Sequence, residues 1–256
     1  MIKTLARHFM SCALFFYFTN LFGQGLDDLA DKYRTDKGSK WGSAHHFTRH
    51  YEKLLEHLKD SHISLLEIGT WKGSSLRMWA EYFPNAKIYS IDIKPLTAYA
   101  HEFNPMVDAY PVDFTHERVR FFVGKQQDPT FLDYFSSAVQ EELDVIIDDG
   151  SHVSYDQQMS FFKLFKKVKP GGFYIIEDLS YHPHPHPTIL EMQDILMKIE
   201  NNEANEIHFS SYLEQVSENE INDALRNIES IQWFDSAFPY HGANSFAAIR
   251  KKGAIQ

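Results

Sequence analysis

The chain has 256 residues, of which 43% are hydrophobic and 15% aromatic, enough for the core of one large domain. Its formal net charge of -10 argues against a general nucleic-acid binder, because neutralising phosphates requires clustered Lys and Arg. Cys12 is the single cysteine, which excludes an intramolecular disulfide and a cysteine-rich zinc site.

Residues 1–25 differ from the rest of the chain and are expected to form a separate N-terminal segment. Lys3 and Arg7 precede an uncharged apolar stretch from Phe9 to Phe18, an order typical of a signal peptide. The stretch is shorter than the roughly 20 apolar residues of a membrane-spanning helix. No clear small-residue cleavage signal follows it. Export, a membrane-surface anchor, an amphipathic helix and an upstream false start all remain open.

Residues 26–60 are expected to form a helical N-terminal cap. Tyr51, Leu54 and Leu58 recur at helical spacing. A loop rich in Gly and Ser, residues 35–43, interrupts the helical pattern.

Residues 61–256 alternate between strand and helix patterns. The expected strands are 63–68, 87–93, 119–123, 143–147 and 173–176, the last after a turn at 170–172. The helices expected between them are 74–83, 131–142 and 155–168. Near-continuous apolar strands alternating with helices indicate a parallel sheet covered by helices on both faces.

The end of the chain changes pattern again. A polar helix is expected over 189–202, and the segments 231–234 and 245–249 are expected to form a closing hairpin. The sequence therefore predicts an α/β fold of the Rossmann-like, doubly wound kind. Its mostly parallel sheet would carry a C-terminal antiparallel edge hairpin.

Glycines and acids gather where the predicted parallel strands end. Ligands of such sheets bind at the carboxyl ends of the strands. The residues at these ends are Gly69, Asp92, Gly124, Asp148, Asp149, Glu177 and Asp178. Asp also terminates strands for local reasons, as a turn or cap residue, but seven such residues at one edge favour a ligand site.

The loop after the first strand favours a nucleoside-containing ligand. Gly69 and Gly73 allow a sharp turn and a close approach of the backbone to a ligand. Their spacing matches neither the dinucleotide fingerprint nor the phosphate-binding loop, which argues against NAD, FAD and nucleoside triphosphates. Glu67 before the loop suits a cationic or zwitterionic ligand, and Asp92 suits the hydroxyls of a ribose.

A second cluster of acids follows the fourth and fifth strands. Asp149, Glu177 and Asp178 are expected at neighbouring strand ends, where three carboxylates repel one another unless a cation lies between them. Oxygen ligands suit Mg²⁺, Mn²⁺ or Ca²⁺. His152, at the start of the next helix, is placed to act as a general base. The alternative is that Ser151 or Asp149 caps the helix and the other acids contact only solvent or Arg.

Three segments together resemble a group of class I methyltransferases, the metal-dependent sugar O-methyltransferases of the mycinamicin and macrocin type. They are residues 65–69, 144–152 and 169–179, and the resemblance covers about residues 27–180. The cephalosporin hydroxylase-like proteins are related to this group. The resemblance implies S-adenosylmethionine as the cofactor, with Mg²⁺ (or Mn²⁺) held by Asp149, Glu177 and Asp178. It implies His152 as the catalytic base.

The expected cofactor pocket combines the strand ends with an N-terminal element, residues 33–38, that resembles a family segment folding over the cofactor. Its predicted residues are Thr35, Asp36, Lys37, Glu67, Gly69, Gly73, Ser74, Asp92, Gly124, Gln126 and Asp148. Lys125 stands where the family usually has an acid, and Arg34 stands where Gly is common.

Outside these motifs, residues 182–187 alternate His and Pro and are expected to be extended. The tract is expected to shape a lid on the substrate side, with a second metal site as the alternative. The resemblance does not extend to the family's large N-terminal oligomerisation domain, so formation of a homo-oligomer stays open.

The predicted function is S-adenosylmethionine-dependent, Mg²⁺-assisted O-methylation of a hydroxyl on a sugar or polyhydroxy small molecule. Two alternatives remain, a metal-dependent enzyme like the hydroxylase-like relatives and a non-catalytic protein that binds S-adenosylmethionine. The expected location is the cytoplasm, where this cofactor is made, with membrane association through residues 1–25 left open. Export through a signal peptide is the alternative, and it would separate the enzyme from its cofactor.

Overall fold

A computed structural model describes residues 24–106, 108–112, 114–179, 190–207, 209, 213–237 and 245–254. The proposed signal peptide or anchor lies outside the described residues except for its last two positions, and the His-Pro tract lies wholly outside them. No helix within the described ranges is both long enough and apolar enough to cross a membrane.

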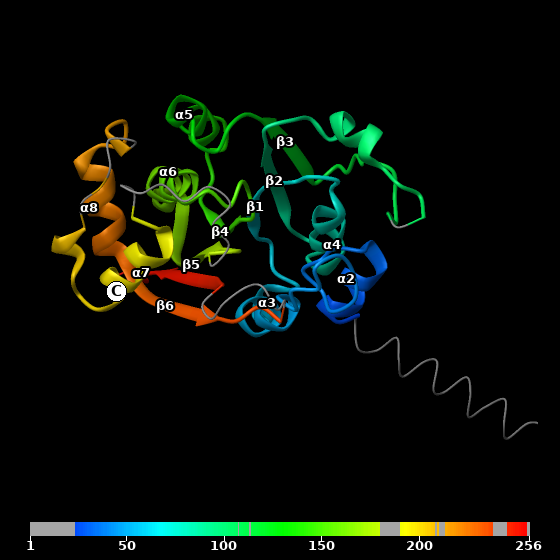
Figure 1. Ribbon diagram of the computed structural model, residues 1–256, viewed down its shortest axis with the longest axis horizontal. Coiled ribbons are helices and arrows are strands. Elements are labelled where there is room, and N and C mark those ends of the chain that lie inside the picture. Colours follow the sequence, from blue (N-terminus) through cyan, green and yellow to red (C-terminus); the bar gives the residue numbers. More distant parts are fainter. Residues whose placement is uncertain are drawn as a thin grey trace, which may run out of the picture.

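A seven-stranded sheet forms the centre of the protein (Figure 1). Its strands are β1 (Ser64–Ile68), β2 (Lys87–Asp92), β3 (Val119–Val123), β4 (Leu143–Asp148), β5 (Val168–Ile176), β6 (Ile228–Phe234) and β7 (Phe246–Lys251). Their order is β3-β2-β1-β4-β5-β7-β6, with β1 to β5 parallel and β7 antiparallel to both β5 and β6. The predicted fold class and its antiparallel edge hairpin are confirmed.

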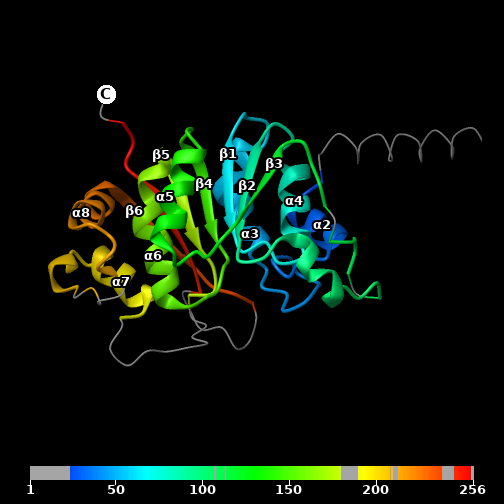
Figure 2. The same ribbon diagram turned by 90° about the horizontal axis from the view of Figure 1, so that it is seen from above.

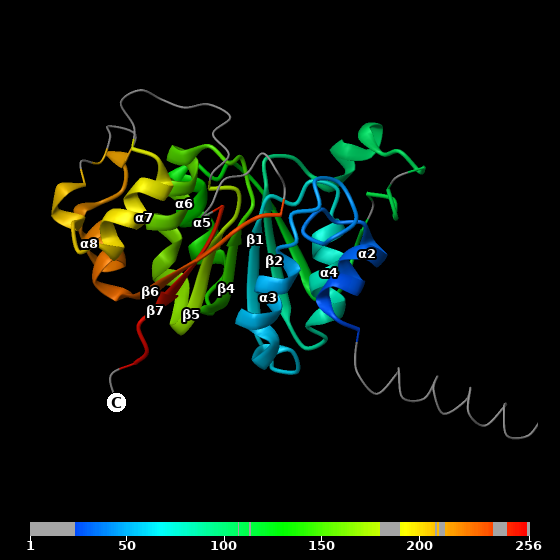
Figure 3. The same ribbon diagram turned by 60° about the horizontal axis from the view of Figure 1, so that its bottom comes forward.

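Helices cover both faces of the sheet. They are α2 (Leu26–Tyr33), α3 (Thr48–Leu55), α4 (Ser74–Tyr82), α5 (Pro129–Ala138), α6 (Ser154–Leu164), α7 (Met192–Glu200) and α8 (Glu218–Asn227). Short 3-10 turns lie at Glu56–Leu58, Leu96–Glu102, Phe165–Lys167 and Ala204–Glu206. In Figure 1, α5 and α6 lie above the sheet and α2 and α3 below it. Figures 2 and 3 show α7 and α8 at the β6 end, opposite α2 and α4.

Two apolar cores follow from this layering. The alternating side chains of a strand point to opposite faces, so β1 sends Leu66 into the core beneath α5 and α6 and Leu65 into the core beneath α2 to α4. Both side chains are fully buried. The N-terminal helices share the second core, where Tyr51 packs against Trp79 of α4 with ring centroids 4.9 Å apart. Both cap helices and their intervening loop occur where the sequence predicts them, while the division of the chain into cap and domain stays a prediction.

Three elements differ from the sequence prediction. Strand β5 begins at Val168, before the expected turn, because Val168 pairs with Leu143 and the register then shifts within the strand. Helix α5 ends at Ala138 because Val139 is already extended. Helix α8 was not predicted, although Ser217 and Glu220 form a capping box at its start, a signal readable in the sequence.

Candidate active site

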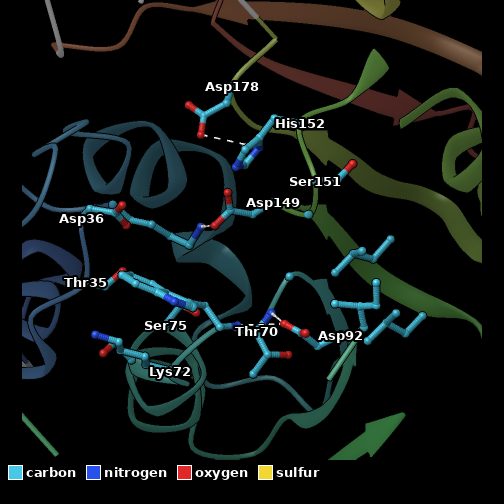
Figure 4. A pocket seen from close by; sticks show the side chains of 18 of the residues that line it. Thr35, Asp36, Thr70, Lys72, Ser75, Asp92, Asp149, Ser151, His152 and Asp178 are labelled. Atoms are coloured by element: carbon cyan, nitrogen blue, oxygen red, sulfur yellow. Dashed lines mark hydrogen bonds and ion pairs between the residues drawn. The ribbon is translucent and has the colours of Figure 1, made fainter. Parts of the chain in front are cut away.

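A cavity of about 800 Å³ lies at the edge of the sheet where the parallel strands end (Figure 4). The predicted site residues that line it are Thr35, Asp36, Lys37, Gly69, Ser74, Asp92, Gly124, Gln126, Asp149, His152 and Asp178. The others, Glu67, Gly73, Asp148 and Glu177, do not line it. The strand ends and the N-terminal loop therefore bring most of the predicted residues to one cavity.

The loop between β1 and α4 is fixed by its glycines and by Asp92. Gly69 has φ +90°, and an added Cβ would overlap the carbonyl oxygen of Asp149. Asp92 accepts hydrogen bonds from the backbone N–H groups of Thr70 (2.8 Å) and Trp71 (2.9 Å). Its other oxygen accepts one from the Tyr99 hydroxyl at 2.8 Å. Asp92, predicted to contact a ribose, thus also holds the glycine loop.

Glu67 lies behind this loop, fully buried. Its carboxylate accepts hydrogen bonds from Ser75 Oγ (2.8 Å) and Trp79 Nε1 (3.1 Å), both on α4. Burial raises the pKa of Glu67 to about 7, although the nearby charge of Lys37 acts in the opposite direction. Through these contacts Glu67 helps to hold α4 against the sheet, and its negative charge lies near Lys37.

Lys37 inserts a buried ammonium among three carboxylates. Its Nζ contacts Asp149 and lies 2.8 Å from Glu177 Oε1 and 3.8 Å from Glu67 Oε1. The same oxygen of Glu177 accepts a hydrogen bond from the Tyr51 hydroxyl. Burial lowers the pKa of Lys37, but the three carboxylates raise it more, and the net pKa lies well above its ordinary value. Lys37 thus joins the N-terminal loop to the carboxylates at the ends of β1, β4 and β5.

A group of potential metal ligands lies beside this network. Asp149, His152 and Asp178 each offer one ligand atom, and these atoms lie within 4.8 Å of one another. In Figure 4 the Asp178 carboxylate faces the His152 ring, and Asp149 lies next to both. The two carboxylates supply oxygen ligands, which suit a divalent cation such as Mg²⁺ or Mn²⁺, and the imidazole lies beside them.

This group differs from the predicted ligand set, because it contains His152 in place of Glu177. The described hydrogen bonds of Glu177 Oε1 come from Lys37 and Tyr51. Burial raises the pKa of Glu177 well above its ordinary value, with Asp149 adding to the rise. The assignment of Glu177 as a metal ligand stays a prediction, and its ligation would require its other oxygen or a shift in this network.

His45 is a neighbour of the site that no motif indicated. Its Nδ1 lies 3.6 Å from Asp178 Oδ1, whereas His152 faces the other oxygen of that carboxylate. Its backbone oxygen accepts a hydrogen bond from the N–H of Ala237, so the same residue also contacts the segment after β6. Sequence reasoning missed it because these partners are distant in the chain.

Asp148 supports the wall of the cavity near β3 and β4. It is fully buried and accepts hydrogen bonds from Gln126 Nε2 (3.1 Å) and from the Ser160 hydroxyl. Burial raises the pKa of Asp148 to about 6. Gln126 Oε1 in turn accepts the N–H of Ser151 at 2.7 Å. Asp148 thus orients Gln126, which lines the cavity.

Comparison with known proteins agrees with this architecture. Residues 66–179 match a family described as a methyltransferase domain. Demethylmacrocin O-methyltransferase of Streptomyces fradiae is 37% identical over 161 residues, 60% of this chain and 36% of the relative. Mycinamicin VI 2''-O-methyltransferase of Micromonospora griseorubida is 36% identical over 161 residues, with the same shares covered. The chain thus spans little more than a third of the length of these curated relatives.

Solved structures give the same relationship. The MycE methyltransferase from the mycinamycin biosynthetic pathway, in complex with Mg and SAH, is 27% identical with a TM-score of 0.63, covering 92% of this chain and 58% of that chain. A structure of MycE with Mg, SAH and mycinamycin VI is 28% identical with a TM-score of 0.62. The match covers 91% of this chain and 57% of that chain. Residues 66–179 therefore match a methyltransferase domain, and the chain is similar to the sugar O-methyltransferases of the mycinamicin and macrocin type.

Proposed function

We propose that the protein is an S-adenosylmethionine-dependent, divalent-metal-assisted O-methyltransferase. Its substrate is a hydroxyl of a sugar or another polyhydroxy small molecule. The observation that carries the proposal is the position of Asp149, His152 and Asp178, which line the same cavity as the glycine loop and Asp92. The relatives are named for O-methylation of sugar-bearing molecules, which supports the same substrate class.

In this proposal one set of residues binds the methyl donor and another set binds the metal ion. The glycine loop, Asp92 and the N-terminal loop hold S-adenosylmethionine, and Asp149 and Asp178, with Glu177 as a further candidate, hold Mg²⁺ or Mn²⁺. When bound, S-adenosylmethionine supplies an electrophilic methyl group, and the cation lowers the pKa of a nearby hydroxyl.

His152 accepts the proton of the substrate hydroxyl. We assign it to the proton and not to the metal, because Mg²⁺ prefers oxygen ligands. Its Nδ1 lies 3.7 Å from Asp178 Oδ2. A carboxylate on that side favours the tautomer with the proton on Nδ1 and leaves Nε2 to act as the base.

The N-terminal loop forms part of the wall of the cavity in which the reacting groups would bind. Thr35, Asp36 and Trp41 line the cavity, and Lys37 anchors the loop beneath it. Enclosure keeps water from the substrate oxygen and holds the reacting groups in one orientation, which contributes to catalysis without further chemistry.

A methyl-transfer assay tests the proposal. Purified protein is incubated with S-adenosylmethionine and a panel of sugars and glycosides, and S-adenosylhomocysteine is measured with Mg²⁺ and with EDTA. Formation of S-adenosylhomocysteine that depends on both an acceptor and Mg²⁺ is the expected result. Absence of any S-adenosylmethionine binding in calorimetry would contradict the whole proposal. Unchanged metal affinity and activity in Asp149→Ala would contradict its metal part alone.

We propose the cytoplasm as the place of action, because S-adenosylmethionine is made there. N-terminal sequencing of the native protein tests this, since removal of residues 1–25 would indicate export. Formation of a homo-oligomer and attachment to membranes through residues 1–25 stay predictions, which light scattering and membrane fractionation address.

A further inference from the structure

His45 is a buried histidine that the proposed chemistry does not use. It lies in the loop between α2 and α3, its exposed fraction is 6%, and it is not one of the described residues that line the cavity. Its ring stacks on that of Phe47, with the centroids 5.0 Å apart. Ala44 and His46 on either side both have a positive φ, of 48° and 60°. Packing and backbone thus fix the place of this imidazole, and it can influence the site only through another residue.

The residue through which His45 can act is Asp178. His45 Nδ1 lies 3.6 Å from Asp178 Oδ1, whereas Asp178 Oδ2 lies 3.7 Å from His152 Nδ1. The two imidazoles therefore approach the two oxygens of one carboxylate, and contacts at both oxygens restrict its rotation. Groups that contact a metal-binding carboxylate from outside the coordination sphere orient it and strengthen its binding of the metal.

The contacts of His45 favour a proton on Nδ1. Ser236 Oγ lies 3.2 Å from Nδ1 and donates a hydrogen bond to the backbone oxygen of His45 at 3.5 Å, so it can accept one from Nδ1. The carboxylate of Asp178 is also an acceptor. Both neighbours of Nδ1 thus favour an N–H at this position. A neutral imidazole is therefore sufficient for the contact with Asp178.

The same histidine connects Asp178 with the ends of the closing hairpin. Beside the ring of His45, the backbone N–H of Ser236 donates to Ser245 Oγ at 2.7 Å. The backbone oxygen of Ser245 accepts a hydrogen bond from the N–H of Leu179 at 2.9 Å, and Leu179 directly follows Asp178. The segments after β6, before β7 and after β5 therefore meet around His45 and Asp178.

We propose that His45 is a positioning residue for methyl transfer, which orients the Asp178 carboxylate and so strengthens its binding of the divalent cation. This inference rests on the proposed function, since the orientation of Asp178 matters only if Asp178 holds Mg²⁺ or Mn²⁺. In this role His45 acts through Asp178, contacts no ligand and takes no proton. It also makes the metal affinity depend on the N-terminal loop and on the ends of the hairpin.

Calorimetry with Mn²⁺ and the full chain, without an acceptor, tests the inference. His45→Leu keeps a side chain of similar bulk but removes the N–H, and it should weaken the binding of Mn²⁺ by about 10-fold or more. His45→Asn carries an amide nitrogen close to the position of Nδ1 and should restore most of the affinity. The affinity for S-adenosylhomocysteine, measured with EDTA, should stay at the wild-type value in both variants.

His50→Leu is the matched control. His50 is also a buried histidine, and its Nε2 lies 3.0 Å from the backbone oxygen of Asp235, in the segment after β6. Its described contacts do not include Asp178. Loss of stability should be common to His50→Leu and His45→Leu, whereas loss of Mn²⁺ affinity should be confined to His45→Leu.

A double-mutant cycle with Asp178→Asn tests the route of the effect. If His45 acts through the Asp178 carboxylate, His45→Leu should weaken Mn²⁺ binding much less in the Asp178→Asn background than in the wild-type background. Effects of the two substitutions that multiply independently would overturn the inference.

The outcomes separate this inference from the proposed function. If wild-type protein binds neither S-adenosylhomocysteine nor Mn²⁺, the proposed function itself is wrong. If it binds both, and His45→Leu binds Mn²⁺ as tightly as wild type or His50→Leu loses as much affinity, His45 is not a positioning residue. Should His45→Leu fail to fold, His45→Gln replaces it, because its longer side chain carries the amide beyond the position of Nδ1. Unchanged Mn²⁺ affinity in that variant would likewise overturn the inference.

Discussion

His152 and Asp178 face each other with 3.7 Å between Nδ1 and Oδ2, and both adopt the left-handed backbone conformation, with φ of 57° and 56°. Residues other than glycine rarely adopt this conformation, which costs roughly 1 kcal/mol or more each. Both follow adjacent strands, β4 and β5, whose pairing fixes their relative position. The fold thus holds the imidazole and the carboxylate in register before any ligand arrives.

His152→Asn should abolish turnover while methyl-donor binding persists. Asn tolerates the left-handed backbone, so the change removes the base and keeps the loop. Loss of a general base lowers kcat by about 10²–10⁴-fold. S-adenosylhomocysteine formation and calorimetry measure the two effects. His57→Asn, an exposed histidine, is the control. Activity in His152→Asn above half of the wild-type value would show that another group takes the proton.

Asp178→Asn should weaken the dependence on metal. The amide keeps an oxygen at the site but removes one negative charge, and the affinity of carboxylate sites for divalent ions follows the number of charged ligands. The concentration of Mg²⁺ that gives half-maximal activity should rise by about 10-fold or more. Titration with Mg²⁺ and with Mn²⁺ measures this, beside the exposed Asp60→Asn control. An unchanged titration would exclude Asp178 as a ligand.

Lys37→Met should destabilise the protein by roughly 3–5 kcal/mol at neutral pH, because the buried Glu67 and Glu177 and the part-buried Asp149 lose their shared cation. Urea unfolding followed by fluorescence measures the free energy. Lys40→Met is the matched control, since this lysine of the same loop is 61% exposed and pairs with Asp31 at the surface. It should change the free energy of unfolding far less than Lys37→Met does, because exposed ion pairs contribute little. Equal losses in the two variants would contradict the assigned role of Lys37.

Gly69→Ala should destabilise the protein more than Gly171→Ala. Both glycines have a positive φ, of 90° and 79°, so the backbone strain of an alanine is similar at each position. An added Cβ at Gly69 overlaps the backbone of Asp149, while at Gly171 it meets nothing within 4 Å. The difference should exceed about 2 kcal/mol by thermal unfolding, since backbone must move. Equal destabilisation by the two substitutions would contradict this prediction, because it would show that the backbone near Gly69 can shift at little cost.

The contribution of Glu220 to the stability of the protein should be lost at acidic pH. Burial raises the pKa of Glu220, but hydrogen bonds from Lys166, the Ser217 backbone and Lys163 lower it more, to about 2. A carboxyl whose pKa is lowered by folding stabilises the folded protein at pH values above its pKa in the unfolded chain. This stabilisation is lost as the pH falls through its pKa in the folded protein. Glu220→Gln should therefore cost about 1 kcal/mol at pH 6, allowing for solvent screening, and markedly less at pH 2.5. Urea titrations at the two pH values measure the difference, and a cost independent of pH would contradict it.

The location of the candidate site at one edge of the sheet could be predicted from the sequence, because the carboxyl ends of parallel strands lie at the same edge. Gly69, Asp92, Asp149 and Asp178 each follow a readable apolar strand, and the structure brings all four to one cavity. The network around that edge could not be predicted in the same way. The Tyr51 hydroxyl reaches Glu177 across 126 positions of sequence, a contact that depends on how α3 packs on the sheet. Local motifs carry no information about such contacts.

Charge explains another limit of sequence reasoning. A strand that ends in several acids predicts a cation, and a divalent metal was the expected one. The structure brings a lysine to the same carboxylates, so Asp149 and Glu177 are already partly neutralised by the chain itself. Sequence spacing cannot distinguish these sources of positive charge, because Lys37 precedes the first strand and reaches the site only through the folded N-terminal loop.

The position of Lys37 has a consequence for how the protein can be divided. The segment matched by the methyltransferase domain begins at residue 66, after Lys37 and Tyr51. A fragment cut to that segment would leave Glu67, Asp149 and Glu177 facing one another without their ammonium and without the tyrosine donor. The smallest unit that keeps these charges paired therefore starts upstream of the matched segment, and the N-terminal loop is an integral part of it.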